Sequence, residues 1–157
     1  MKHFIIFLSC FVFITLVLIL SSCKKSDPAP VDVAAMLQGK TWKLSAVAIN
    51  PADNGVTDLY STIEPCNRDN TFKFNAGNVF LIDEDATKCD PSYPQTVTGT
   101  WNYDSSTKIL STSTVYMGST SNMGYVVTNI NETSFSCFLT YDVGTVTHTV
   151  TYTYSRQ

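Results

Sequence analysis

The stretch Thr145-Val146-Thr147-His148-Thr149-Val150-Thr151-Tyr152-Thr153-Tyr154 alternates without exception between threonine and a larger residue. Successive side chains of a β-strand point to opposite faces, so this period of two predicts a strand with one polar face and one buried face. The larger residues would share the buried face: Val146, His148, Val150, Tyr152 and Tyr154. The period does not fit a helix, which favours a β-sheet as the basis of the fold.

A second alternating segment lies immediately before this strand, and the turn residues Val143-Gly144 predict that the two form a hairpin. In that hairpin Cys137 would lie opposite Val150, and Leu139 would lie opposite His148. Apolar residues then meet on one face and hydroxyl-bearing residues on the other.

Turn residues continue to separate strand-like segments toward the N-terminus, so most neighbours in the sequence are expected to pair as hairpins. The turn at Ser105-Ser106, for example, would place Trp101 opposite Leu110. The two long connections are 50–69 and 84–95. Eight strands are predicted: 40–49, 70–75, 78–83, 96–103, 108–114, 124–131, 134–142 and 145–154.

Eight antiparallel strands joined mainly by hairpins, after a short helix over 33–38, predict an all-β fold of the up-and-down barrel type. A barrel exposes no sheet edge, which suits a secreted all-β domain. A sandwich of two β-sheets is the alternative. The two differ in one pairing, because only the barrel requires strand 40–49 to lie beside strand 145–154.

Several motifs resemble those of lipocalin-like domains. Leu37-Gln38-Gly39-Lys40-Thr41-Trp42-Lys43-Leu44 is similar to their opening motif, in which a glycine stands shortly before a tryptophan at the start of the first strand. Asp69-Asn70-Thr71-Phe72-Lys73-Phe74-Asn75, the segment up to Cys89-Asp90 and Gly99-Thr100-Trp101-Asn102-Tyr103 are similar to lipocalin-like lipoproteins of Bacteroidetes. The resemblance covers roughly residues 34–155. It implies an eight-stranded barrel and no particular ligand.

Closure of such a barrel would bring Trp42 and Arg156 to the same rim, because the first and last strands run antiparallel. Lipocalin-like proteins show a similar arrangement of a late arginine on the early tryptophan. A guanidinium over an indole forms a cation–π contact of about 0.5–2 kcal/mol. We therefore expect a structural contact that seals the barrel floor. The alternative is that Arg156, second from the end, lies in a solvated tail.

The first 22 residues are predicted to be an export signal of the bacterial lipoprotein type. An uncharged apolar run from Phe4 to Leu20, a little short for a comfortable membrane span, ends in Leu20-Ser21-Ser22-Cys23. This sequence resembles the lipobox, in which an apolar residue and two small residues precede an acylated cysteine. Two or more acyl chains, palmitate for instance, on Cys23 would give stable anchoring. A retained membrane anchor is the alternative.

The chain then divides into a signal peptide over 1–22, a lipidated tether over 23–32 and a barrel domain over 33–157. The tether is charged or proline-rich and has no apolar period. The expected location is the cell envelope, with the protein anchored by lipid in the outer membrane on its periplasmic or its surface face.

Three cysteines fall in the barrel domain. Cys66 and Cys89 lie in polar, loop-like contexts, whereas Cys137 lies within a strand, where a free cysteine behaves as a small apolar residue. Export implies an oxidising compartment, so we expect a disulfide between Cys66 and Cys89. Three free thiols or a different pairing are the alternatives.

The composition excludes several classes of function. The formal net charge is −3, and no basic patch suited to nucleic acid occurs. No histidine-rich or cysteine-rich tract occurs, and the acidic run Asp83-Glu84-Asp85 with Asp90 lacks the spacing of a calcium loop. We therefore predict no metal, no other cofactor and no nucleic-acid partner.

Candidate ligand contacts come from the inward faces of the predicted strands, whose aromatic residues are first of all core. His148 could add a polar contact. The candidate ligand-binding residues are Trp101, Tyr103, Tyr125, His148 and Tyr152. Cys137 and His148 would be diagonal neighbours, but no third group orients the histidine, so no catalytic residue is predicted.

The sequence therefore predicts a non-catalytic binding protein whose ligand, if it has one, is small and apolar or amphipathic. The alternative is a filled barrel that docks a protein or glycan partner of the envelope through loops 50–69 and 84–95. An open interior favours the first function, and a solid core with aromatic residues exposed on the loops favours the second.

Overall fold

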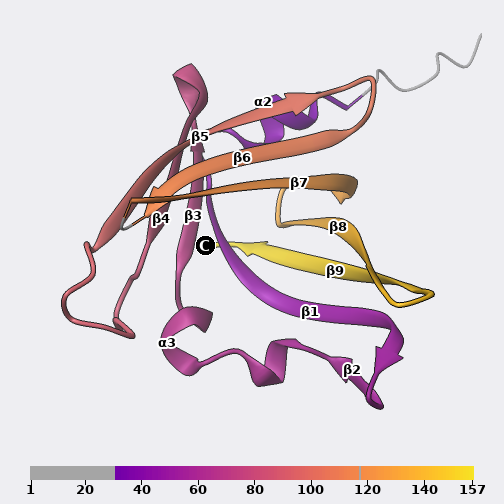
Figure 1. Ribbon diagram of the computed structural model, residues 1–157. Helices are drawn as coiled ribbons and strands as arrows, with labels where there is room; N and C mark the ends of the chain where they lie inside the picture. Colours follow the sequence, from indigo (N-terminus) through magenta and orange to yellow (C-terminus); the bar gives the residue numbers. More distant parts are fainter. Residues whose placement is uncertain (1–30, 117) are drawn as a thin grey trace, which may run out of the picture. The chain divides into compact units, whose positions relative to one another are not determined.

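A computed structural model describes residues 31–116 and 118–157. Asp32–Gln157 form one compact unit that contains the whole sheet and both clusters of buried apolar side chains (Figure 1). Because every strand finds its partners inside this unit, it can fold on its own. The predicted signal at 1–22, the lipidation site Cys23 and most of the tether lie outside the described residues. No described helix is long and apolar enough to cross a membrane.

Within the described residues, nine strands follow the short helix α2 (Val33–Leu37). They are β1 (Thr41–Asp53), β2 (Val56–Asp58), β3 (Thr71–Asn75), β4 (Val79–Asp83), β5 (Thr96–Asp104), β6 (Ile109–Tyr116), β7 (Ser119–Ile130), β8 (Ser134–Val143) and β9 (Val146–Arg156). All except β2 correspond to predicted strands. The connection 50–69 holds β2, the 3₁₀ turn η1 (Tyr60–Thr62) and the helix α3 (Pro65–Arg68), none of which the sequence pattern had indicated.

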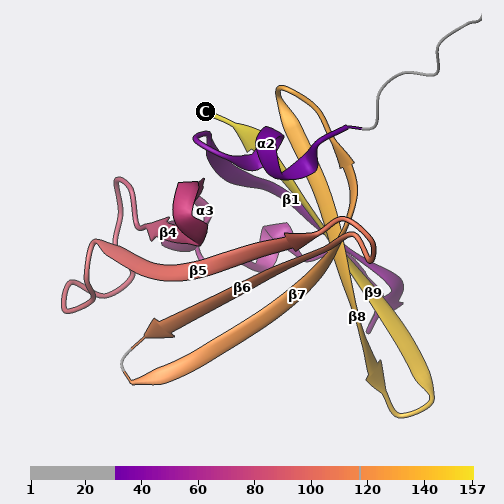
Figure 2. The same ribbon diagram turned by 90° about the horizontal axis from the view of Figure 1, so that it is seen from above.

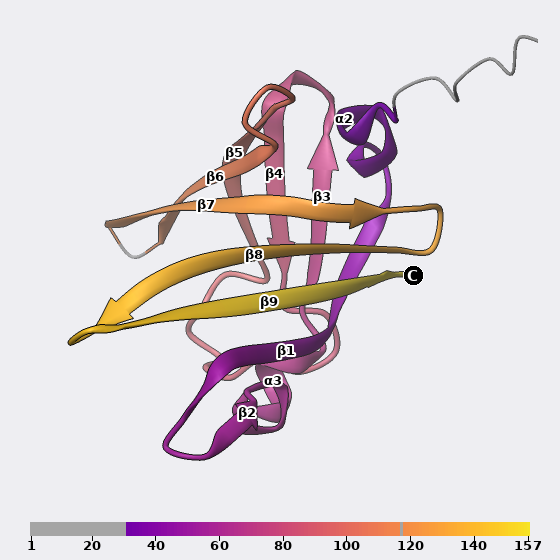
Figure 3. The same cartoon turned by 90° about the vertical axis from the view of Figure 1, so that its right-hand side faces the viewer.

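The sheet closes on itself through β1. Each strand from β3 to β9 pairs antiparallel with the next, and β1 pairs with both β3 and β9. The start of β1 lies between these two strands, and its later part runs along β9 as far as the pair Asn50 and Thr149. Figure 3 shows β1 passing from the side of β3 to the side of β9. This closure confirms the eight-stranded barrel rather than the sandwich, with β2 as one extra strand on the second half of β1.

The β8–β9 hairpin has a register two residues away from the predicted one. Cys137 pairs with Tyr152, not with Val150, because Gly144 and Thr145 form the turn. Gly144 has a φ of +62°, a conformation that glycine adopts without steric cost. A shift of two residues leaves every side chain on its predicted face.

The β5–β6 hairpin shows the same difference. Trp101 pairs with Thr112 rather than with Leu110, because the connection is a four-residue turn over 105–108. Lys108 ends this turn with a φ of +60°. The inward positions of both strands again remain as predicted.

One end of the barrel is closed by α2. The Asp32 side chain caps this helix by accepting a hydrogen bond from the Ala35 backbone N–H at 3.0 Å. Leu37 and Trp42 are fully buried, and the Trp42 indole N–H donates to the Leu37 carbonyl at 3.2 Å. The Phe135 ring meets the indole edge to face, with centroids 4.9 Å apart. The floor of the barrel is therefore filled with side chains.

Trp42 and Arg156 lie opposite each other in the β1–β9 pairing, as the barrel requires. The expected cation–π contact is not formed, because the Arg156 guanidinium lies 3.4 Å from a carboxylate oxygen of Glu132. Within the described part of the chain, the guanidinium that covers a ring is that of Arg68, 5.7 Å from the Tyr60 centroid. Burial of the indole under α2 leaves its faces to core side chains instead.

A disulfide joins the two long connections. Cys66 in α3 is bonded to Cys89 in the 84–95 loop, with Cα atoms 5.2 Å apart. Cys137 is free and buried. Both assignments confirm the prediction, and the bridge ties α3 to the loop that connects β4 with β5.

The barrel wall is incomplete between β7 and β8. These strands pair over Val126–Ile130 and Phe135–Phe138, which is the second half of β7 and the first half of β8. Beyond that point β7 continues with β6, and β8 continues with β9. Figure 2 shows the resulting β6–β7 and β8–β9 hairpins diverging from each other.

Candidate functional site

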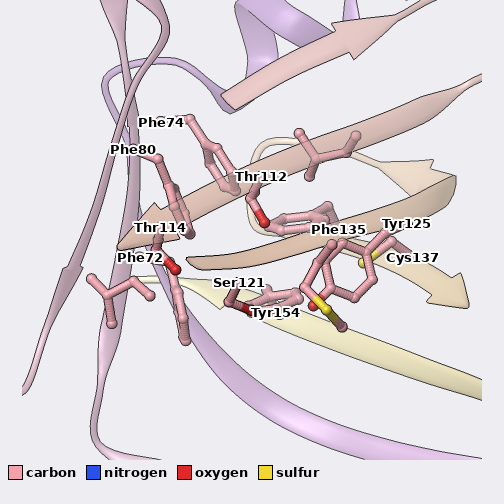
Figure 4. Close-up of a pocket in the computed structure, with 13 residues that line it drawn as sticks. Phe72, Phe74, Phe80, Thr112, Thr114, Ser121, Tyr125, Phe135, Cys137 and Tyr154 are labelled. Carbon is pink, nitrogen blue, oxygen red and sulfur yellow. The ribbon is translucent and has the colours of Figure 1, made fainter. Parts of the chain in front are cut away.

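A cavity of about 220 Å³ lies inside the barrel. Figure 4 shows its lining side chains pointing into one space from several strands of the barrel. They form an apolar wall on β3 and β4 (Phe72, Phe74, Phe80 and Ile82), a hydroxyl wall on β6 and β7 (Thr112, Thr114 and Ser121), and a remainder made of Leu110, Met123, Tyr125, Phe135, Cys137 and Tyr154.

The apolar wall is held rigidly by contacts between rings. Phe80 stacks on both Phe72 and Phe74, with centroids 6.4 and 5.1 Å apart. Phe74 also meets Trp101 edge to face at 5.4 Å, and Phe72 meets Tyr154 in the same way at 5.5 Å. Each ring is therefore fixed by at least one other, and the wall presents a preformed apolar surface.

The hydroxyl wall is formed by short side chains at inward positions. Thr114 and Ser121 are directly opposite each other in the β6–β7 pairing, and Thr112 lies two residues from Thr114 on the same face. Within the described residues, the side chains of these three residues make no hydrogen bond to another protein group. They are available to a molecule in the cavity.

The lining carries no ionised side chain. Burial raises the pKa of the Cys137 thiol to about 12. Burial also raises the pKa of Tyr125 and Tyr154 well above the usual value of a tyrosine, and nearby ionisable groups raise it further. All three groups are therefore protonated and neutral at neutral pH.

The cavity reaches the surface beside the first half of β7, which pairs with β6 but not with β8. Met123 lines the cavity and is also 38% exposed. It belongs to the part of β7 that pairs with β6 and has left β8. The divergence of β7 from β8 thus provides access to the interior.

Of the five predicted ligand-binding residues, Tyr125 lines the cavity and the other four do not. Tyr152 lies behind it, with its ring edge to face on Tyr125 at 5.5 Å. Trp101 supports Phe74 and donates its indole N–H to the Asn75 carbonyl at 2.9 Å. Tyr103 packs against the core cluster that contains Phe74 and Trp101. Tyr152, Trp101 and Tyr103 therefore pack against or near the lining residues without facing the cavity themselves.

His148 lies elsewhere and has a structural role. It pairs with Tyr141 rather than with Leu139, and its ring stacks on Tyr141 at 5.5 Å. Its Nδ1 lies 3.0 Å from the Pro51 carbonyl oxygen, which attaches the end of β1 to β9. Cys137 is opposite Tyr152, four residues along β9, so the two are not diagonal neighbours as expected.

The acidic loop residues hydrogen-bond locally. Asp83 accepts from the Gln95 amide at 2.9 Å and from the Asp85 backbone N–H at 2.9 Å. Asp90 accepts from the Ser92 backbone N–H at 2.8 Å. In the described ranges, no three His, Cys, Asp or Glu side chains gather closely enough to hold a metal ion.

The comparisons with known proteins concern the part of the chain that builds most of the cavity. A family model described as a lipocalin-like domain matches residues 37–137. This range runs from the buried Leu37 of α2 to Cys137 in the cavity lining. No curated protein matches the chain.

Proposed function

The chain belongs to the lipocalin-like domain family, and we propose from this premise that it is a non-catalytic, lipid-anchored binding protein of the cell envelope that holds a small apolar or amphipathic molecule inside its barrel. The observation that carries the proposal is the cavity of about 220 Å³ between the apolar and hydroxyl walls. A barrel that served only as a scaffold would gain stability by filling this space.

The size of the cavity limits the ligand. Drug-sized ligands occupy pockets of about 300–1,000 Å³, whereas a dry apolar cavity of about 150 Å³ is large enough for benzene. A volume of about 220 Å³ lies between these. The ligand is therefore of the size of a molecule with one or two rings or a short acyl chain.

The anchor in this proposal rests on Leu20-Ser21-Ser22-Cys23, which ends the apolar run of the signal. Acyl chains on Cys23 and the tether that follows would hold the domain at a membrane surface. The resemblance to lipocalin-like lipoproteins of Bacteroidetes supports the outer membrane as that surface.

The surface of the long loops supports ligand binding over partner docking. Among the described residues, the large apolar side chains that are well exposed lie at strand positions, apart from Val31. The loop tyrosine Tyr93 packs edge to face on Tyr116. Tyr60 packs against the second core cluster, which consists of Leu44, Val47, Ile49 and Val150. The loops thus display no cluster of aromatic residues of the kind that anchors a protein or glycan partner.

Two measurements on the unit Asp32–Gln157 test the proposal. Native mass spectrometry of the unit exported to a bacterial periplasm should reveal a small bound molecule. After removal of that molecule, 2-naphthol should bind with one site per chain in a calorimetric titration.

A matched pair of variants locates the binding site. Thr114→Trp fills the cavity and should abolish naphthol binding, whereas Val115→Trp adds the same side chain at a neighbouring position that is 61% exposed. Val115→Trp should bind like the parent. Equal binding by the parent and by a folded Thr114→Trp variant would refute a ligand site inside the barrel.

A further inference from the structure

We propose that the ligand is an uncharged ring compound with hydroxyl, carbonyl or amide groups along one edge, and that the site rejects carboxylates and ammonium ions of the same shape. This inference rests on the proposed binding function and specifies its ligand class. It follows from the charge, the hydrogen-bonding groups and the shape of the cavity.

The absence of charge in the lining disfavours a ligand whose ionic group lies inside the cavity. No Lys, Arg, His, Asp or Glu side chain is among the residues that line the cavity. A charge brought into a low-dielectric site without a partner loses its hydration and gains no ion pair, so its burial is strongly unfavourable. The wall cannot supply an anion either, since burial keeps the Cys137 thiol protonated with a pKa of about 12.

The hydroxyl wall defines where the polar groups of the ligand lie. Thr114 and Ser121 face each other across β6 and β7, and residues so placed have Cβ atoms about 4.5–5.5 Å apart. Thr112 follows about 7 Å along the strand. Hydroxyl groups both donate and accept, so these three, gathered on two adjacent strands, suit hydroxyl, carbonyl or amide groups at one edge of a molecule.

The apolar wall defines the remaining shape. Phe72, Phe74 and Phe80 stack on one another and offer an apolar surface in the same cavity as the hydroxyls. Because these rings pack on one another, their faces are not arranged around an open cage for a cation. A flat ring system with one polar edge fills the space between the two walls without leaving polar atoms unpaired.

Three naphthalene derivatives of nearly equal shape test the charge selectivity on the unit Asp32–Gln157. They are 2-naphthamide, which is neutral, 2-naphthoate, which is an anion at neutral pH, and 2-naphthylmethylammonium, which is a cation. Titration calorimetry should give a dissociation constant for the amide at least about tenfold below that of either ion. Naphthoate should recover affinity as the pH falls toward its own pKa.

Two variants test the role of the hydroxyl wall. Thr114→Val replaces the hydroxyl with a methyl group of similar size and should weaken amide binding several-fold while leaving 2-methylnaphthalene binding unchanged. The control is Thr98→Val on β5, whose side chain is exposed on the outer face of the barrel, and it should change neither affinity.

The outcomes separate this inference from the proposed function. Binding of naphthoate or the ammonium compound as tight as that of the amide overturns the inference and leaves the cavity as a binding site. Equal losses for naphthamide and methylnaphthalene in Thr114→Val overturn the assigned role of the hydroxyl wall. Failure of every naphthalene compound to bind would overturn the proposed function as well.

Discussion

The backbone of Gly99 in β5 passes so close to the carbonyl oxygen of Ser113 in β6 that no side chain fits between them. A Cβ built on Gly99 would overlap that oxygen and would lie 2.7 Å from Cγ2 of Thr114. The motif Gly99-Thr100-Trp101 therefore has a steric basis. Glycine allows β5 and β6 to approach each other beside the hydroxyl wall.

Gly99→Ala should destabilise the domain by about 1–3 kcal/mol, because the clash involves backbone that cannot move aside. Gly124→Ala is the matched control. A Cβ on Gly124 would meet Ile109 Cγ2 at 3.7 Å, an ordinary contact. It should be neutral or stabilise by about 0.4–1 kcal/mol. Urea unfolding of both variants measures the difference, and equal effects would contradict the steric account.

Trp42 and Arg156 should contribute very differently to stability although they are partners in one strand pair. Trp42→Ala removes a fully buried ring and should cost about 3–5 kcal/mol. Arg156→Ala removes an exposed ion pair with Glu132 and should cost less than about 1 kcal/mol. If Arg156→Ala instead lowered the free energy of unfolding by about 2 kcal/mol or more, the size expected of a desolvated cation–π contact, the guanidinium would have to contact the indole after all.

Loss of the Cys66–Cys89 disulfide should destabilise the domain by about 3 kcal/mol, because the bond closes a loop with a sequence separation of 23 residues. The double variant Cys66→Ala/Cys89→Ala should unfold at a correspondingly lower urea concentration. In the parent, alkylation after denaturation without reductant should label Cys137 alone. Label on Cys66 or Cys89 would show that the bond does not form.

Stability should fall in alkaline solution. In an unfolded chain the Cys137 thiol and the tyrosines ionise near pH 9 and 10, whereas burial raises the pKa of Cys137 to about 12 and also raises that of Tyr125 and Tyr154. Above pH 9 the unfolded state releases protons that the folded state retains, so unfolding becomes more favourable as pH rises. The contribution of these protonated groups to the free energy of unfolding is fully present below pH 9. It is lost progressively as the pH rises toward the pKa values of the folded state.

Urea midpoints measured from pH 8 to pH 11 check this prediction. Cys137→Ala should lower the midpoint overall, because it empties core volume, but should flatten the decline between pH 9 and 10. A midpoint that stays constant across this range would show that the cavity wall tolerates charge.

Cys23→Ser should prevent lipidation. On the proposed lipid anchor, the variant should keep its uncut signal and lack acyl chains, because Cys23 would be both the site of acylation and the first residue after the cut. Metabolic labelling with palmitate and mass determination of the N-terminus measure this. A Cys23→Ser protein that is labelled and processed like the parent would show that the anchor lies elsewhere.

The fold could be predicted from the sequence because strand alternation determines which face each residue occupies. In β9, the pattern holds from His148 to Tyr154: His148 and Val150 are buried, and Tyr152 and Tyr154 pack against the core. Val146, beside the hairpin turn, is 44% exposed instead of buried. Hairpin register could not be obtained in the same way. A shift of two residues leaves the faces unchanged, so the choice depends on turn conformations such as those of Gly144 and Lys108.

The cavity was less predictable than the fold. Alternation identified the inward aromatic residues, but large side chains such as Trp101 fill the barrel rather than line its space. The cavity lies where inward positions carry short side chains, namely Thr112, Thr114 and Ser121. Those short inward residues on two adjacent strands are a signal that the sequence contains and that a search for aromatic residues overlooks.

Residues 50–69 were the least predictable segment. All three residues of β2 are exposed, so no alternation of burial marks it as a strand. Leu59, Tyr60 and Ile63 nevertheless pack against the second core cluster and cover part of β1. Their burial depends on contacts with β1 and β9 that the local sequence pattern does not reveal.

The pairing of β1 with β9 also determines when the domain can form. The first strand cannot obtain its last partner until the ribosome has made the C-terminal residues, so the barrel cannot close while the chain is still being synthesised. Contacts between such distant segments give a high contact order, which slows folding. On the proposed route of export, this delay would keep the chain open enough to be threaded through a translocation channel before β1 and β9 pair.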